Sequence, residues 1–358
     1  MLIPTEQSVG IFHPFTNSPK CCRIVAIRKK RKTVLAMNFK EYMKAAKITA
    51  DKDDTVEYMT LADKMMSNVF VNGQRNSPTA SGVYEADVTE LMKVYSKLKS
   101  ECDYRLTFNT VMLKVMVEGL KAAPRLNAHF PYNHTATAGK LIIKKHIDVS
   151  MAICKSDGMT FQMRLPQLED KSLREIACLA ADARERLDRS DMDEVMFEVS
   201  RQRIVGEMSR GKVVSPWAQA IRGSFGKGKV LHLSKTLKSD FLKLTGKKPW
   251  EDEGGIRMEE IREGSVCFTN WGSICETSRF NVVSAPMLYP QVFLFSVGKV
   301  REEKYAYEDE NGNVRIGTKQ ILPLGLNFDH KIGGFHELIP FIAKLEEIFG
   351  NPEVICEW

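Results

Sequence analysis

The sequence predicts a mixed α/β fold, in which amphipathic helices alternate with short apolar strands. Residues 107–122 and 171–187 repeat apolar side chains at helical spacing. Residues 147–153 alternate apolar and polar side chains, which is typical of a half-buried strand. Residues 290–298 form a continuous apolar run, which indicates a strand buried on both faces of a sheet.

The other expected elements follow from local signals. We expect a helix around residues 61–70 and a strand over residues 81–87, whose last residue, Asp87, is a candidate N-cap for the next helix. The remaining elements are strands at 141–143, 265–270 and 321–328, a hairpin turn at 308–313 and a final helix at 337–349.

The composition is that of an ordinary globular protein: 43% of the 358 residues are hydrophobic and 27% are charged. No apolar run approaches the ~18 residues that span a bilayer. The N-terminus lacks the basic start and apolar core of a secretion signal. Eight cysteines without C-x-x-C pairs predict reduced, mostly buried thiols, with neither a disulfide framework nor a metal site. We therefore expect a cytoplasmic protein that is not transmembrane.

The net charge of +7 is unevenly distributed. Residues 201–249 contain twelve Lys or Arg and two acidic residues, so the rest of the chain is slightly acidic. This excess predicts either an acidic or anionic partner for residues 201–249 or a solvated basic face without a partner. We do not expect a nucleic-acid partner, because the charge of this stretch is the only feature that would support one.

The stretch 327–334 (NFDHKIGG) follows an apolar strand and precedes a helical pattern. His330 is therefore expected on a strand-to-helix turn, where backbone on both sides would hold it beside a cleft. A general base needs such pre-organisation. The alternative is a loop histidine without a chemical role.

Two segments near the C-terminus resemble motifs of one enzyme family. Residues 264–272 (GSVCFTNWG) resemble its "GgTFTISNLG", and residues 328–331 (FDHK) resemble its "FDHR". Upstream, residues 85–91 (EADVTEL), 126–128 (LNA) with 147–153 (IDVSMAI), and 171–176 (KSLREI) follow in the family's order. Residues 81–358 thus resemble the catalytic domain of the dihydrolipoyl acyltransferases of 2-oxo acid dehydrogenase complexes.

This resemblance implies a fold, an activity and an assembly. The fold would be an α+β two-layer sandwich like that of chloramphenicol acetyltransferase, with a mixed sheet flanked by helices. The activity would be transfer of an acyl group from acyl-coenzyme A to a thiol, amine or hydroxyl acceptor. The assembly would be a homotrimer, or a multiple of trimers, with the site at the subunit interface.

The resemblance also assigns roles to residues. His330 would be the general base, and the Thr269 hydroxyl would stabilise the oxyanion. Asp329, Asn270 and Lys331 would support the site, while Trp271 and Ser273 would bind coenzyme A or substrate. Coenzyme A would be a co-substrate, without a metal and without a lipoyl group on this chain.

The resemblance divides the chain into two parts. Residues 1–80 would be a partly helical extension without a lipoyl domain, and residues 81–358 a catalytic domain with a basic insertion at about 190–262. The family continues H-R-x-x-D-G, whereas Gly334 and Phe335 stand at those last two positions here. This departure favours an alternative, a catalytically degenerate trimer that serves as a scaffold or binding subunit. A third hypothesis, binding of nucleic acid or a membrane surface through residues 201–249, rests on charge alone.

Overall fold

The computed structural model describes residues 50–190, 254–272 and 284–358, except positions 60, 135, 157–159 and 257, together with residues 192, 195 and 199. The chain separates into two compact units, residues 1–57 and 58–358. The fold below is that of the second unit. Three predicted features lie outside the described residues: the basic stretch 201–249, residues 1–49, and Ser273, which was expected to bind coenzyme A or substrate.

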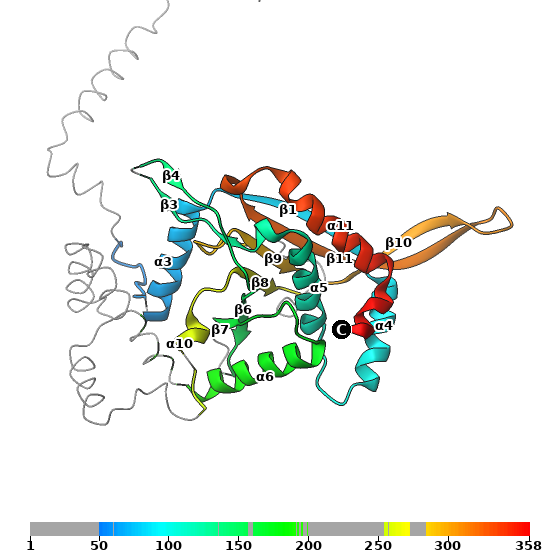
Figure 1. The fold of residues 1–358 in the computed structure, drawn as a ribbon, viewed down its shortest axis with the longest axis horizontal. Helices are drawn as coiled ribbons and strands as arrows, with labels where there is room; N and C mark the ends of the chain where they lie inside the picture. The colour runs from blue at the N-terminus through cyan, green and yellow to red at the C-terminus, as the bar shows by residue number, and fades with distance from the viewer. Residues whose placement is uncertain are drawn as a thin grey trace, which may run out of the picture. The chain divides into compact units, whose positions relative to one another are not determined.

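A seven-stranded mixed sheet forms the centre of the second unit (Figure 1). Its strands run in the order β1-β11-β9-β8-β6-β7, and β10 also pairs with β11. β8 is parallel to β6 and to β9, and the other pairings are antiparallel. The predicted α/β class and mixed sheet are confirmed. The strand bounds are β1 Thr79–Asp87, β6 Val149–Cys154, β7 Thr160–Leu165, β8 Val266–Asn270, β9 Phe293–Val297, β10 Arg301–Glu308 and β11 Val314–Asp329.

Two small sheets lie outside the main one. β2 (Ala128–His129) pairs with β5 (Ile142–Ile143), and β3 (Tyr132–Asn133) pairs with β4 (Ala138–Gly139). The strand expected at 141–143 therefore exists but belongs to a separate ribbon, and both residues of β5 are exposed. Apolar side chains alone did not reveal which sheet this segment joins.

Two of the described helices begin at a side-chain cap. Thr107 accepts a hydrogen bond from the Thr110 amide at the start of α5, and Ser172 with Glu175 forms a capping box at the start of α6. Asp87 is not the N-cap of α4: Val88 occupies that position without a side-chain hydrogen bond, and the Asp87 carboxylate accepts from the Thr89 amide and hydroxyl. The helix bounds are α3 Leu61–Asn76, α4 Thr89–Glu101, α5 Phe108–Ala122, α6 Leu173–Arg189, α10 Met258–Ile261 and α11 Ile339–Gly350, with 3-10 helices η1 Pro124–Leu126, η2 His330–Ile332, η3 Phe335–Leu338 and η4 Pro352–Glu357.

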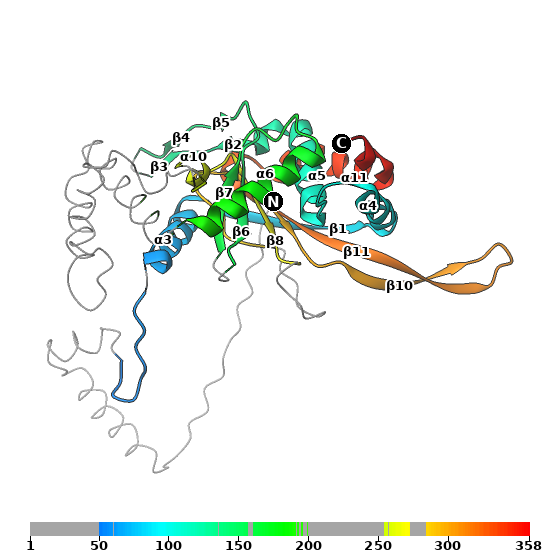
Figure 2. The same ribbon diagram turned by 90° about the horizontal axis from the view of Figure 1, so that it is seen from below.

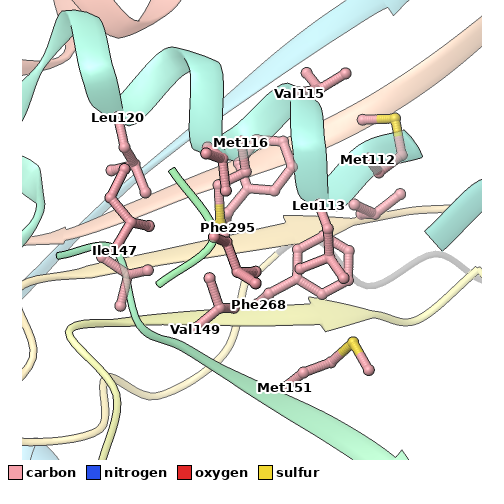
Figure 3. Close-up of a cluster of buried hydrophobic side chains, with 14 of the residues drawn as sticks. Met112, Leu113, Val115, Met116, Leu120, Ile147, Val149, Met151, Phe268 and Phe295 are labelled. Atoms are coloured by element: carbon pink, nitrogen blue, oxygen red, sulfur yellow. The ribbon is translucent and has the colours of Figure 1, made fainter. Parts of the chain in front are cut away.

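Helices cover one face of the sheet, and that interface is apolar (Figure 2). Figure 3 shows Leu113 and Met116 of α5 directed toward Phe268 of β8 and Phe295 of β9, whereas Met112 projects from another side of the helix. Such burial contributes about 1.5–3 kcal/mol for each large apolar side chain.

The α5 and α11 helices approach each other closely at Gly119. A Cβ atom there would meet the Phe341 ring at 2.6 Å. Phe341 in turn packs its ring edge against Phe293, with the ring centroids 5.0 Å apart. Gly119 thus lets one aromatic ring join the two helices to the sheet.

Among the described residues, a loop packs against the opposite face of the sheet. Cys267 and Leu294 form a small second apolar cluster with Met287 and Leu288. Buried polar residues continue this face: Ser150, Thr269, Ser296, Asn327 and Asp329 are each at most 8% exposed. The helix-covered face provides the apolar core, whereas this face carries polar groups that are equally buried.

A two-stranded ribbon of β10 and the first half of β11 projects from the body (Figure 2). The predicted hairpin turn at 308–313 is confirmed. The strand expected at 321–328 is only the end of β11, which begins at Val314. The ribbon was missed because its side chains are mainly charged or polar, and its strand conformation depends on pairing with its neighbour.

All five described cysteines are free thiols. Cys154, Cys178 and Cys356 are exposed and only Cys267 is buried, so the expectation of mostly buried thiols is wrong for this set. Burial raises the pKa of Cys267 to about 12. The described residues contain no cluster of three or more potential metal ligands. None of the helices that the structure describes has both the length and the apolarity for crossing a membrane.

Candidate functional site

The turn that carries His330 follows the central strand β11. The Asp329 amide donates to the Val292 carbonyl at 2.9 Å, and the His330 amide donates to the Pro78 carbonyl at 2.8 Å. The backbone is thereby held on both sides, as expected from the sequence. The imidazole itself belongs to an exposed residue, and its ring lies 6.3 Å from that of Phe335 in an edge-on arrangement.

An ion pair between Lys331 and Asp329 stabilises this turn. Lys331 Nζ lies 2.5 Å from a carboxylate oxygen of Asp329, whose side chain is 1% exposed. The other Asp329 oxygen accepts from the Lys331 amide at 2.9 Å. The same ammonium donates to the Asn76 carbonyl at the end of α3 and lies over the rings of Phe130 and Tyr132. Asp329 and Lys331 therefore fix the turn and tie it to the two flanking segments.

The segment after the turn is attached to η1. Arg125 Nε lies 2.9 Å from a carboxylate oxygen of Glu337, and Arg125 Nη2 donates to the Ile332 carbonyl at 2.9 Å. Gly334 starts η3, and Phe335 packs its exposed ring against Phe328, 5.3 Å between centroids. An aromatic ring thus lies beside His330, and Gly334 stands at the position where the resemblance implies an aspartate.

The other half of the expected site lies at the end of β8. Thr269 is level with Ser296 of β9, and its side chain lies on the face opposite to that of Phe268. Asn270 points to the opposite face, where its amide donates to Asn109 in the first turn of α5. Both residues nevertheless line the cavity of about 440 Å³ at the end of β8, and Asn270 supports the strand end through α5.

Trp271 directly follows the last residue of β8. Its amide donates to the Val297 carbonyl at 2.9 Å. Its indole Nε1 is buried and finds no hydrogen-bond partner in the described chain. A buried donor without an acceptor costs free energy, which a hydrogen bond to a ligand oxygen would offset.

One chain does not bring Thr269 and His330 together. Thr269, Ser296 and Gly325 are level across the sheet, whereas His330 lies five residues beyond Gly325 along β11. At about 3.3 Å per residue, roughly 16 Å separates the two levels along the strands. The two groups therefore lie toward opposite ends of the sheet.

Buried polar side chains extend between these ends. Asn327 Nδ2 donates to Ser296 Oγ at 3.3 Å, and Ser296 Oγ donates to the Gly325 carbonyl at 3.3 Å. Further along the face, Gln291 Nε2 donates to Ser150 Oγ at 2.9 Å. These contacts make the face polar yet ordered.

Two cavities adjoin the ends of β8, and sequence reasoning missed most of their residues. One of about 360 Å³ is lined by His129, Lys144 and Arg164, among others. The His129 ring contacts the Gly264 carbonyl at 2.8 Å; burial lowers its pKa, while this contact acts the other way. The other cavity, of about 440 Å³, brings Arg105, Asn109 and Arg184 near the end of β8. These three residues belong to no motif, so only the fold reveals them.

Comparison with protein families gives one match over most of the chain. The model described as "2-oxoacid dehydrogenases acyltransferase (catalytic domain)" matches residues 51–223 and 250–356. The unmatched residues 224–249 lie inside the insertion predicted at 190–262.

Curated relatives match over a shorter stretch. The dihydrolipoyllysine-residue acetyltransferase components of the pyruvate dehydrogenase complex from two strains of Staphylococcus epidermidis are each 26% identical over 130 residues. The match covers 36% of this chain and 29% of each relative, so it spans less than a third of the relatives' length.

Solved structures share the fold across most of the chain. The cubic core of the pyruvate dehydrogenase multienzyme complex superposes with a TM-score of 0.55 at 17% identity, over 87% of this chain and 99% of that one. Azotobacter vinelandii dihydrolipoamide acetyltransferase gives 0.56 at 16% identity over the same shares. The truncated catalytic core from the Thermoplasma acidophilum 2-oxoacid dehydrogenase complex gives 0.51 at 16% identity, over 84% and 99%.

Proposed function

Since the chain belongs to the 2-oxoacid dehydrogenases acyltransferase (catalytic domain) family, we propose that it is an enzyme that transfers an acyl group from acyl-coenzyme A to a thiol, amine or hydroxyl acceptor. The observation that carries the proposal is the braced turn of His330, which presents an exposed imidazole at the end of a buried strand. The match to the curated relatives is partial, so the activity is inferred from these residues and from the family.

In the proposed mechanism His330 is the general base. Its imidazole takes the proton of the acceptor, whose sulfur, nitrogen or oxygen attacks the thioester carbonyl carbon. The Thr269 hydroxyl donates to the oxyanion of the tetrahedral intermediate. When the intermediate collapses, the carbon–sulfur bond breaks, the coenzyme A thiolate leaves, and the imidazolium returns the proton to it.

The neighbours of these two residues have supporting roles in this proposal. Asp329 and Lys331 hold the turn, and Asn270 holds the end of β8 through Asn109. Trp271 offers its unpartnered indole N–H to coenzyme A or substrate. The resemblance implies that Ser273 also binds coenzyme A or substrate.

We infer that two chains complete each site. The roughly 16 Å between the levels of Thr269 and His330 is too long for one tetrahedral intermediate to touch both. The β10–β11 ribbon supports assembly, because its Tyr305 and Tyr307 on one face and Val314 and Ile316 on the other are 44–74% exposed. Exposed apolar groups of this kind mark interaction surfaces. A homotrimer, or a multiple of trimers, is the assembly that the resemblance favours.

The experiment measures free thiol release by the purified chain. Acetyl-coenzyme A and longer acyl-coenzyme A esters are each offered with dihydrolipoamide, amines and phenols. The His330→Ala variant is expected to lose about 10²–10⁴ in turnover, since it removes general-base catalysis. Size-exclusion chromatography with light scattering should show an unchanged oligomer, and undiminished turnover would overturn the mechanism.

Mixed assemblies test whether the site is shared. Co-expressed His330→Ala and Thr269→Ala chains would form interfaces that combine an intact His330 from one copy with an intact Thr269 from another. Activity should therefore return in the mixed oligomer, although each variant alone is nearly inactive. A mixed oligomer verified by mass that stays as inactive as the separate variants would contradict the shared site.

A second candidate function is a catalytically silent scaffold with the same fold. Gly334 and the ring of Phe335 beside His330, where the family has its aspartate and glycine, favour it. Detectable thioester turnover in the assay above would exclude this candidate.

We also propose a cytoplasmic location, an extension over residues 1–80, and a basic insertion at about 190–262 that binds an anionic partner.

A further inference from the structure

A polar cavity of about 360 Å³ lies where β6 and β8 begin and β7 ends. This volume is within the roughly 300–1,000 Å³ of small-molecule sites, whose walls are usually apolar. Here, apart from Gly264, every residue that lines the cavity has a polar or charged side chain. Because polar groups lose free energy when an apolar ligand covers them, these walls favour a small polar ligand.

The cavity is separate from the residues proposed to carry out acyl transfer. Neither Thr269 nor His330 lines it. Thr269 lies five residues beyond Gly264 in β8, which is roughly 16 Å at about 3.3 Å per residue. His330 follows β11, and β9 lies between β11 and β8. Two strand spacings, about 10 Å, therefore separate the strand of His330 from the β8 edge of the cavity.

The floor of the cavity is held by a closely spaced backbone network. Ser265 Oγ accepts from the Asp148 amide at 3.0 Å and lies 3.1 Å from the Asp148 carbonyl, to which it donates. A Cβ atom at Gly264 would meet the same carbonyl oxygen at 2.4 Å, so glycine permits this approach. His129 Nε2 contacts the Gly264 carbonyl at 2.8 Å. The floor is thus ordered before a ligand arrives, which favours binding.

Three cations from separate segments line the cavity. Lys144 follows β5, Arg164 belongs to β7, and Arg262 follows α10. Arg164 Nη2 lies 2.5 Å from a carboxylate oxygen of Asp148, so these two charges offset each other. Neither Lys144 nor Arg262 forms a salt bridge to a described residue. The other carboxylate in the lining is that of Glu263, an exposed residue. Cations therefore outnumber carboxylates in the lining by three to two.

This arrangement suits a phosphate group. A phosphate monoester has three acceptor oxygens and nearly two negative charges, so it accepts charge-assisted hydrogen bonds from several cations at once. A carboxylate has two oxygens, which a single arginine fork satisfies. We propose that this cavity binds a small polar molecule through its phosphate group, which Lys144, Arg164 and Arg262 hold. The proposal is independent of acyl transfer, since it concerns a separate cavity.

Binding of glycerol 3-phosphate to the full-length protein, without coenzyme A, tests the proposal. Isothermal titration calorimetry at low ionic strength should show binding of glycerol 3-phosphate and at least tenfold weaker binding of glycerol, which lacks the phosphate. Residues 201–249 are also basic, so variants are needed to assign the binding to this cavity.

Variants localise the site. Lys144→Gln combined with Arg262→Gln should weaken binding of glycerol 3-phosphate at least tenfold, because a charge-assisted hydrogen bond is lost at each position. Lys145→Gln is the matched control: this exposed neighbour of Lys144 carries the same charge but does not line the cavity, so affinity should change less than about twofold. Glu263→Gln should strengthen binding about two- to tenfold, because it removes a charge that repels the phosphate.

Three results would overturn the proposal: no binding of glycerol 3-phosphate, equal binding by wild type and the double variant, or equal losses in the double variant and Lys145→Gln. Glycerol that binds as tightly as glycerol 3-phosphate would overturn the phosphate assignment. The gain expected in Glu263→Gln cannot arise from unfolding, and unchanged or weaker binding there would also contradict the site. Thr269→Ala should bind the probe like wild type, which separates this proposal from the fate of the acyl-transfer mechanism.

Discussion

The two faces of the central sheet are equally buried but chemically different. Phe268, Phe293 and Phe295 fill the helix-covered face, while Thr269, Ser296 and Asn327 occupy the other. Thr269 and Ser296 alternate with these phenylalanines along β8 and β9, and Asn327 lies on the neighbouring strand β11. The apolar face needs no specific partners, whereas each polar group on the other face needs a hydrogen bond. One face thus provides stability, and the other provides an ordered polar surface where chemistry can occur.

The largest expected effect on stability comes from the helix-covered face. Phe341→Ala should lower the free energy of unfolding by about 3–5 kcal/mol, because it empties the contact between α5, α11 and the sheet. Urea denaturation measures this change. Ile339→Ala, on the exposed side of the same helix, should change it by less than about 0.5 kcal/mol. Similar losses in the two variants would contradict the proposed role of this face.

On the other face, Lys331→Met tests the brace under His330. It should cost about 3 kcal/mol of stability, because the buried Asp329 carboxylate loses its cation. Urea denaturation is again the measurement. Lys93→Met, which breaks an exposed pair with Glu90, should cost no more than about 1 kcal/mol. Equal, small losses in both variants would show that the Asp329–Lys331 pair does not hold the turn.

Thr269→Ala should separate chemistry from stability. If the hydroxyl stabilises the oxyanion, acyl-transfer turnover falls by about 10²–10³. Loss of one buried hydroxyl costs only about 1 kcal/mol of unfolding free energy. Steady-state kinetics and urea denaturation on the same sample check both values, and Thr269→Ser should restore turnover. Full activity of the alanine variant would remove Thr269 from the mechanism.

The smallest effect concerns pH. Burial lowers the pKa of His129 in the folded state, so the unfolded chain binds a proton more readily. Stability should therefore be lost as pH falls below about 6.5, by less than about 1.4 kcal/mol per pH unit, because water partly screens the ring. Urea midpoints between pH 7.5 and 5.5 should fall less steeply in His129→Gln. An identical slope in variant and wild type would exclude this contribution.

Several elements were predictable from local patterns. The helices at 107–122 and 171–187 and the strands at 265–270 and 290–298 appear close to their expected bounds, since their apolar periodicity matches burial. β7 and β10 were missed. The segments 160–165 and 301–308 carry many polar side chains, and only pairing with β6 and β11 makes them strands.

The candidate site shows the same division. The sequence by itself determined that His330 ends a buried strand and that Thr269 lies in another, because apolar runs and turn residues act locally. Only the tertiary structure decided that the levels of Thr269 and His330 are roughly 16 Å apart, and that Arg105 and Arg184 meet at one cavity. Those relations depend on strand order and register, which arise from contacts between residues far apart in the chain.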